Sequence, residues 1–290
     1  MSLIENKQFN QMKITLLLFT LFSQLSIFAN EQFVNDSIKV LFVGNSLTYY
    51  NEMPQLLQQM LNEGEEKVKV EQSTFPGMQL RHHLITIKSD YHIGTPEDPN
   101  NLNLSKEKLR NSNWEYVILQ EGTVSFLIPE YVQNSLKSTF SNILAEFGSP
   151  KTKFILFQTW APSNYYPQTY CRPKRPPVDY NSEIEDICSP VITNRNQEIE
   201  IIKKSCEELA AYNKMILSKN GELFYKFNLQ FPELRLYDEE GHPTKAGAFM
   251  NACVFYEVFT NKKAKDLLFL SNLDIKTVVQ IKKFVSENNF

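Results

Sequence analysis

The stretch that most constrains the fold is residues 38–50, which read IKVLFVGNSLTYY. It opens with an apolar run rich in β-branched and aromatic side chains, which is typical of a buried strand. Gly44 and Asn45 then interrupt the run with residue types that favour turns. Ser46 follows, and residues 52–60 carry apolar side chains at helical spacing. A strand, a tight turn and a helix in this order present one side chain at the carboxyl end of a sheet, where α/β proteins bind ligands.

Ser46 has two interpretations at this position. Serine is a preferred N-cap residue, and helix N-termini bind anions, so Ser46 fits a cap or a phosphate site. The position also suits a nucleophilic hydroxyl, because free amides and the helix dipole stabilise negative charge there. A nucleophile needs a base, and the chain has four histidines that can supply it, His82, His83, His92 and His242.

The alternation of segments along the chain predicts the fold class. Strands are expected at residues 38–43, 67–71, 115–119, 153–157 and 223–227. Helices are expected at residues 52–60, 78–88, 131–147, 198–218, 241–259 and 273–287. Strands that alternate with helices favour a mostly parallel sheet with helices on both faces. We therefore predict a five-stranded α/β fold in three layers, formed by one domain.

The N-terminus has the pattern of a secretory signal. Met12 and Lys13 precede an apolar stretch of about fifteen residues, too short for a confident membrane span, and Ala29 is a small residue suited to cleavage. We predict a signal peptide over residues 1–29 and one mature domain over residues 30–290. The protein is then periplasmic or extracellular, with no stable membrane insertion after cleavage.

Export permits disulfides among the four cysteines. Cys171 and Cys188 flank a proline-rich segment that a disulfide can close as a loop. Cys206 and Cys253 lie in helical patterns and fit buried free thiols equally well, so the pairing stays open. No CxxC motif or cysteine and histidine cluster suggests zinc. The net charge of -3 gives no electrostatic case for nucleic-acid binding, and the oligomeric state stays open.

A second candidate residue lies near the carboxyl end, where His242 follows three acids in the segment DEEGHPTKAG. A serine hydroxyl becomes a good nucleophile when an imidazole takes its proton, and a carboxylate orients that imidazole. An acid three residues before the histidine can reach its Nδ1 atom from the same loop. The alternative is a charged surface turn without a catalytic role.

The GNSLT segment that begins at Gly44, the glycine at position 77, and His242 followed by Pro-x-x-Ala-Gly resemble the SGNH (GDSL-like) hydrolase superfamily. Within it the chain is most similar to a bacterial branch whose third strand ends in LQE, here residues 119–121, in place of Gly-x-Asn-Asp. The resemblance covers residues 38–259, with the motifs in the expected order. It implies a flavodoxin-like α/β/α sandwich and ester hydrolysis without a metal or organic cofactor.

The resemblance also implies roles for individual residues. Ser46 is the nucleophile and His242 the base. The oxyanion hole uses the backbone amides of Ser46 and Gly77, whereas the family's asparagine after the third strand is missing. Gln120 stands near that place, and its side-chain amide can donate the same hydrogen bond. Glu121 has the alternative role of holding the loop.

The triad acid departs from the family pattern Asp-x-x-His. Glu239 stands three residues before His242 and ranks first on spacing, and Asp238 ranks second on residue type. Glu240 remains open, since an orienting carboxylate acts through position and charge. The aromatic residues Trp160, Tyr49, Tyr50, Tyr165 and Tyr166 form a candidate rim of a sugar pocket, although such side chains more often pack in the core.

These residues predict a secreted serine esterase that removes acetyl or similar small acyl groups, with a small-molecule or glycan ester as substrate. One alternative is a lipase or thioesterase with the same chemistry. A second is a catalytically inactive glycan-binding protein, which the altered third block and acid would suit.

Overall fold

The computed structural model describes residues 38–63, 68–88, 106, 108, 113–147, 150–161, 165–174 and 185–289. The predicted signal peptide, residues 1–29, lies outside these ranges. Among the helices of the described ranges, none combines the length and the apolar character needed to cross a membrane.

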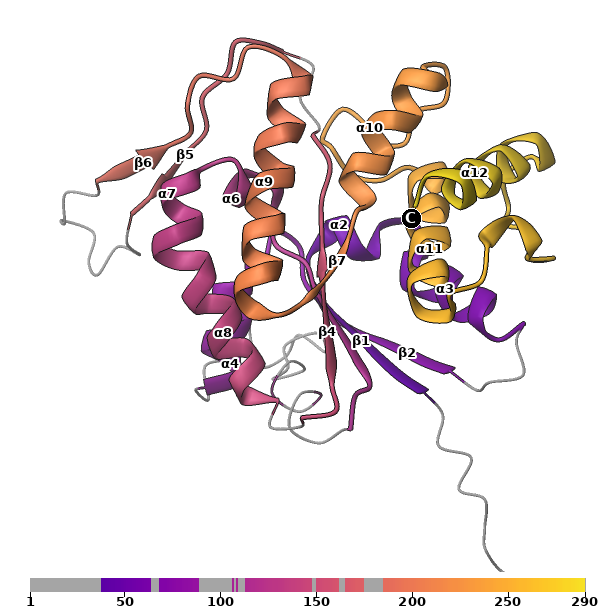
Figure 1. The fold of residues 1–290 in the computed structure, drawn as a ribbon, viewed down its shortest axis with the longest axis horizontal. Coiled ribbons are helices and arrows are strands. Elements are labelled where there is room, and N and C mark those ends of the chain that lie inside the picture. Colours follow the sequence, from indigo (N-terminus) through magenta and orange to yellow (C-terminus); the bar gives the residue numbers. More distant parts are fainter. Residues whose placement is uncertain are drawn as a thin grey trace, which may run out of the picture. The chain divides into compact units, whose positions relative to one another are not determined.

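The centre of the fold is a sheet of five strands that run parallel (Figure 1). The strands are β1 (Ile38–Gly44), β2 (Val68–Thr74), β3 (Tyr116–Leu119), β4 (Lys153–Phe157) and β7 (Ile216–Ser218), in the order β2-β1-β3-β4-β7. Residues 40–43 of β1 are fully buried, as expected for a strand covered on both faces. The predicted α/β fold with a five-stranded parallel sheet is therefore confirmed.

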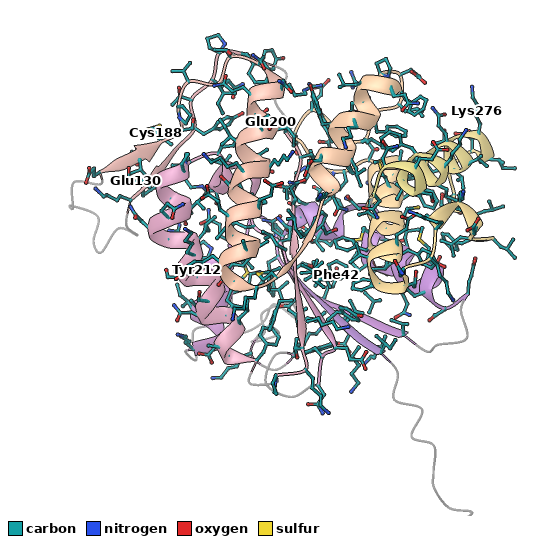
Figure 2. The ribbon with its side chains drawn as sticks, viewed as in Figure 1. Phe42, Glu130, Cys188, Glu200, Tyr212 and Lys276 are labelled. Atoms are coloured by element: carbon teal, nitrogen blue, oxygen red, sulfur yellow. A yellow bond between two sulfur atoms is a disulfide. The ribbon has the colours of Figure 1, made fainter. Side chains whose placement is uncertain are left out.

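Helices cover both faces of this sheet (Figure 1). One layer contains α3 (Met53–Leu61), α10 (Asn220–Gln230), α11 (Lys245–Thr260) and α12 (Ile275–Asn288). The other contains α4 (Leu80–Lys88), α8 (Lys137–Glu146) and α9 (Arg195–Asn213). Side chains alternate between the layers along β1, so that Phe42 (Figure 2) contacts Phe255 of α11 edge to face with the ring centroids 5.1 Å apart.

The last strand is where the sequence-based prediction is wrong. Residues 223–227 were expected to form a strand, but they belong to α10. The strand is β7, which the prediction placed inside a helix over residues 198–218; α9 instead ends at Asn213. A three-residue strand carries almost no periodic signal. The aromatic run of α10 mimics a strand by composition, yet Leu223, Phe224 and Phe227 are buried at a spacing that suits one helix face.

Shorter elements connect these layers. The chain after β1 forms α2 (Ser46–Tyr49) and a 3-10 turn (Tyr50–Glu52), and another 3-10 turn spans Ala264–Asp266. The helix expected over residues 131–147 is divided into α7 (Pro129–Tyr131), a π-helical turn (Val132–Leu136) and α8, and α6 (Thr123–Phe126) precedes them. A hairpin of β5 (Cys171–Pro173) and β6 (Asp186–Cys188) lies beside α7 (Figure 1).

A disulfide between Cys171 and Cys188 closes this hairpin, with the two Cα atoms 4.0 Å apart. It is one of the pairings that the sequence left open. Cys206 and Cys253 are buried free thiols, and burial raises the pKa of both.

Candidate active site

Ser46 follows a turn that only a residue without a side chain can begin. A Cβ atom on Gly44 would stand 2.5 Å from Gln120 Oε1 and 2.9 Å from Gln120 Cβ, both of them too close. The helix cap is Asn45, whose Oδ1 accepts a hydrogen bond from the Leu47 amide at 3.1 Å. Ser46 is therefore the first residue of α2 and not its N-cap, which leaves its hydroxyl free for another role.

Gln120 shapes this turn from the end of β3. Its Oε1 accepts hydrogen bonds from the Asn45 amide at 2.8 Å and from Thr48 Oγ1 at 3.0 Å. Its Nε2 donates to the Glu121 carbonyl at 2.9 Å, and the side chain is buried. Because the oxygen of the amide group faces the turn, the geometry does not favour the prediction that Gln120 donates to an oxyanion.

His83 supports the same turn from α4, although sequence analysis did not include it in the site. Its Nε2 donates to the Gly44 carbonyl at 2.9 Å. Complete burial lowers the pKa of His83 to about 4, so the imidazole is neutral at pH 7. Helical spacing carries a signal for this position, because Leu80, His83 and Ile87 share one buried face.

His242 reaches the turn from the loop before α11. Its Nε2 lies 3.0 Å from Ser46 Oγ, so a serine and a histidine 196 positions apart form a hydrogen bond. The ring of Tyr50 stacks on the imidazole with the centroids 4.0 Å apart and the planes 9° apart. This stacking fixes the plane of the imidazole.

The residues on both sides of His242 are anchored. Asn51 Nδ2 donates to the Pro243 carbonyl at 2.7 Å, and Trp160 Nε1 donates to the Gly241 carbonyl at 3.0 Å. Trp160 is buried and stacks on Phe224 at 4.5 Å. The suggestion that Trp160 rims a sugar pocket is therefore wrong, because its ring packs in the core and its indole N–H holds the histidine loop.

The three candidate acids have different surroundings. Glu240 Oε2 lies 3.5 Å from His242 Nδ1, and the Glu240 side chain is 80% exposed. Asp238 Oδ1 accepts hydrogen bonds from the amides of Glu240 and His242, so its carboxylate shapes the turn. Glu239 forms no hydrogen bond or ion pair with a described residue, and it lines a separate cavity of about 640 Å³. The geometry thus favours Glu240 over Glu239, which spacing ranked first.

The Nδ1 atom of His242 is buried and has no hydrogen-bond partner. Glu240 is close enough for an ion pair with a protonated ring, but its carboxylate makes no hydrogen bond to Nδ1. A buried polar atom without a partner is uncommon, and such atoms concentrate where a protein performs chemistry.

The motifs predict that the amides of Ser46 and Gly77 form the oxyanion hole, and the turn that contains Gly77 begins beside the end of β1, since the Phe75 amide donates to the Gly44 carbonyl at 3.3 Å. Neither the Ser46 amide nor the Gly77 amide takes part in the backbone hydrogen bonds formed by the described residues. Gly77 has a φ of 63°, which L side chains rarely adopt, so the turn that presents its amide favours glycine.

Glu121 follows Gln120 at the end of β3, and its carboxylate is fully buried. It accepts hydrogen bonds from the Leu80 amide at 2.8 Å, the Gly122 amide at 3.0 Å and Ser125 Oγ at 2.9 Å. Burial raises the pKa of Glu121, while these hydrogen bonds and the charge of Arg172 oppose the rise. These contacts are those of a residue that holds the loop. Within the described ranges, no group of three or more histidine, cysteine or acidic side chains is arranged to hold a metal ion.

No protein-family model matches the sequence, and no curated protein sequence does either. Solved structures do match the fold. A DUF4886 family protein from Bacteroides uniformis superposes with a TM-score of 0.65 and 18% identity, over 87% of this chain and 94% of the other. A lipase/acylhydrolase from Enterococcus faecalis has a TM-score of 0.50 and 13% identity, over 77% and 96%.

A protein from Parabacteroides merdae that is named a GDSL-like lipase has a TM-score of 0.51 and 13% identity, over 78% of this chain and 96% of the other. These matches confirm, at the level of the fold, the resemblance to SGNH (GDSL-like) hydrolases that the motifs carry.

Proposed function

We propose that this protein is a serine esterase that hydrolyses small acyl esters, acetyl esters above all, on a carbohydrate. The observation that carries the proposal is the 3.0 Å contact between Ser46 Oγ and His242 Nε2 at the carboxyl end of β1. Nucleophile and base are within hydrogen-bond reach there, as acyl transfer requires. The fold likeness to a lipase/acylhydrolase agrees with this chemistry.

In the proposed reaction, His242 Nε2 takes the hydroxyl proton of Ser46 while Oγ attacks the ester carbonyl carbon. The carbonyl oxygen becomes an oxyanion, and the amides of Ser46 and Gly77 donate to it. The tetrahedral intermediate collapses, and the imidazolium gives its proton to the departing alcohol. Water then attacks the acyl-serine with His242 again as base, which releases the acid and restores Ser46.

The proposed role of Glu240 is to stabilise the imidazolium. When Nε2 accepts the serine proton, Nδ1 also carries a proton and needs an acceptor. The Glu240 carboxylate, 3.5 Å away, is the nearest charged acceptor that the loop offers. Its exposure weakens the effect, because water screens the charge.

The proposal includes export. Its support is the apolar N-terminal segment of the sequence, together with the Cys171–Cys188 disulfide, a bond found mainly in proteins of oxidising compartments. Sequencing the N-terminus of the protein recovered from outside the cytoplasm tests it. A mature N-terminus near residue 30 is expected, and an intact Met1 in the cytoplasm would contradict it.

Hydrolysis of p-nitrophenyl acetate by the purified mature chain tests the esterase proposal, with a series of longer acyl chains to separate esterase from lipase. We expect the acetyl ester to be the best substrate and a serine-directed phosphonate to label Ser46. A preference for long chains would favour the lipase alternative. Absence of both turnover and labelling would favour the inactive glycan-binding protein.

A further inference from the structure

The disulfide-closed hairpin brings a positive charge to the candidate active site. Arg172 is the middle residue of β5 and pairs with Ile187 of β6, whose side chain is buried. The Cys171–Cys188 bridge joins the neighbouring pair of the same register. Pairing and disulfide together hold the backbone on both sides of Arg172, so its side chain starts from a fixed point on a hairpin that lies beside α7 (Figure 1).

The guanidinium of Arg172 points toward the turn at Gly44 and Asn45 that precedes Ser46. It lies over the ring of Tyr131, 5.8 Å from the centroid. Its Nη2 is 3.8 Å from the point where a Cβ atom on Gly122 would stand, and Asn45 Nδ2 is 3.9 Å from that point. Asn45 directly precedes Ser46, so the guanidinium and the nucleophile share one neighbourhood.

The Arg172 guanidinium lies close enough to the buried Glu121 for its charge to oppose the rise in the pKa of that carboxyl. Its Nε is buried without a hydrogen bond, and no ion pair to Arg172 is formed within the described residues. Nε and Nη2 form the edge of a guanidinium that pairs side-on with a carboxylate. An arginine that is stacked and positioned, but forms no ion pair with a described residue, is suited to an anion that arrives with a ligand.

A second arginine acts on the same region. Arg81, from α4, also has a buried Nε without a hydrogen-bond partner. Burial lowers the pKa of His82, and the charges of Arg81 and Arg172 lower it further. The same two charges oppose the burial-driven rise in the pKa of Tyr131. Glu121 is a buried acid in this region, and its carboxylate accepts hydrogen bonds from two amides and a serine hydroxyl. Two guanidinium charges therefore act on a region where this carboxylate is already hydrogen-bonded.

We propose that Arg172, assisted by Arg81, binds a carboxylate of the substrate beside the scissile ester. This inference rests on the proposed esterase function and narrows its substrate class to esters that carry a carboxylate. The carboxylate belongs either to the alcohol part, as in an acetylated uronic acid, or to the acyl part, as in the half-ester of a dicarboxylic acid. A planar carboxylate receives two parallel hydrogen bonds from the guanidinium edge, which fixes its position as well as its charge.

The test compares matched substrates on wild-type protein and three variants. Acetylated glucuronate against acetylated glucose places the carboxylate on the alcohol, and p-nitrophenyl hemiglutarate against p-nitrophenyl valerate places it on the acyl group. The variants are Arg172→Gln, Arg81→Gln and the control Lys174→Gln, which removes a cation of the same hairpin that pairs with Glu185 at 2.9 Å. Thermal unfolding of each variant reports on the fold.

We expect wild-type protein to prefer one anionic ester over its neutral counterpart. Arg172→Gln should raise KM for that ester by about tenfold or more, the size of a lost charge-assisted hydrogen bond, with kcat and the neutral ester changed less than about twofold. Arg81→Gln should have the smaller effect of the same kind, and Lys174→Gln none. The two substrate pairs tell which part of the ester carries the carboxylate.

Equal loss on anionic and neutral esters would overturn the proposal, because Arg172 would then act on the fold or on the reaction itself. A wild-type enzyme without anionic preference would overturn it as well. If no ester is hydrolysed, the esterase function fails, and calorimetry with glucuronate and glutarate decides the subsite separately. Binding of either acid to the full chain that is lost in Arg172→Gln would uphold the subsite, and absence of binding would refute it.

Discussion

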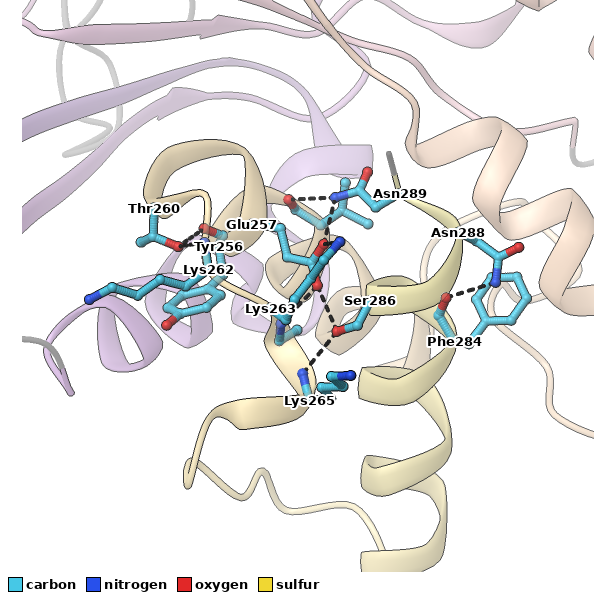
Figure 3. A network of polar contacts seen from close by, with 12 residues as sticks. Tyr256, Glu257, Thr260, Lys262, Lys263, Lys265, Phe284, Ser286, Asn288 and Asn289 are labelled. Carbon is cyan, nitrogen blue, oxygen red and sulfur yellow. Dashed lines mark hydrogen bonds and ion pairs between the residues drawn. The ribbon is translucent and has the colours of Figure 1, made fainter.

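The buried polar groups at the two ends of α11 differ in how fully they are hydrogen-bonded. At its C-terminal end, the fully buried Glu257 accepts hydrogen bonds from the Ala264 amide at 2.8 Å and Ser286 Oγ at 2.7 Å, and Lys263 Nζ lies 3.5 Å away (Figure 3). Before its N-terminal end, His242 contacts Ser46 through one nitrogen and leaves the other buried without a hydrogen bond.

This difference separates a structural network at one end of α11 from the site at the other end that we propose to be catalytic. A satisfied network connects the 3-10 turn at Ala264–Asp266 with α11 and α12 and stabilises one arrangement. An imidazole with an unused nitrogen costs stability but stays ready to change its protonation state during a reaction. Variants at the two ends should therefore affect different measurements, stability at Glu257 and turnover at His242 and Ser46.

The largest expected effect is on turnover, at the reactive end. Ser46→Ala should lower kcat by about 10⁴-fold or more, since it removes the attacking oxygen. The unfolding free energy should change by less than about 1 kcal/mol, because Asn45 and not Ser46 caps α2. Steady-state hydrolysis of p-nitrophenyl acetate measures kcat, and urea denaturation measures the unfolding free energy. The exposed Ser138→Ala is the control, and near-normal turnover in Ser46→Ala would remove Ser46 from the chemistry.

At the C-terminal end of α11, Glu257→Ala should lower the unfolding free energy by about 4 kcal/mol, because the buried donors that now bond to Glu257 would lose their acceptor. Activity per folded molecule should stay the same. The matched control is Glu287→Ala in α12, whose side chain is 56% exposed and pairs with Lys283 at 3.9 Å; it should change stability little. A Glu257 variant that is stable but inactive would contradict the expectation that this end of α11 affects stability and not turnover.

The lowered pKa of His83, whose side chain supports the turn at Gly44 and Asn45, predicts that stability depends on pH. Its folded pKa of about 4 lies below the ordinary histidine value of 6.5, so the unfolded chain binds more protons between these values. Stability is therefore lost as pH falls from about 6.5 to 4, by about 3 kcal/mol from this residue. Urea denaturation across this range should show a shallower slope in His83→Asn than in wild type. Parallel slopes would mean that His83 takes up its proton at the same pH in the folded and the unfolded chain, which would contradict the lowered pKa.

The smallest effect concerns the acid. Glu240→Gln should lower kcat by about tenfold at most, because its carboxylate is exposed and 3.5 Å from the ring. Glu239→Gln should change kcat less than about twofold, which reverses the order that spacing alone predicts. Asp238→Ala should act through the turn and lower stability as well. A strong loss in Glu239→Gln with none in Glu240→Gln would restore the spacing-based assignment.

Local signals in the sequence determined much of this protein. A parallel α/β sheet was predicted from the apolar run of β1, the Gly44–Asn45 turn and the periodic helices. This works because the spacing of apolar residues over a few positions shows which face of an element is buried. The motifs around Ser46 and His242 predicted which two residues meet. Four of the five strands lie where this pattern placed them, and β7 does not because three residues are too few to show a period.

Only the tertiary structure decided how the polar side chains around these two residues are used. Spacing alone placed Glu239 on His242, but the turn that Asp238 organises brings Glu240 to Nδ1. Gln120 turns its oxygen toward Asn45, and Arg172 reaches the site through a hairpin that a disulfide closes. The physical reason is that hydrogen bonds and charges act over a few ångströms between segments distant in sequence, so their partners exist only once the sheet, the helices and the loops are packed.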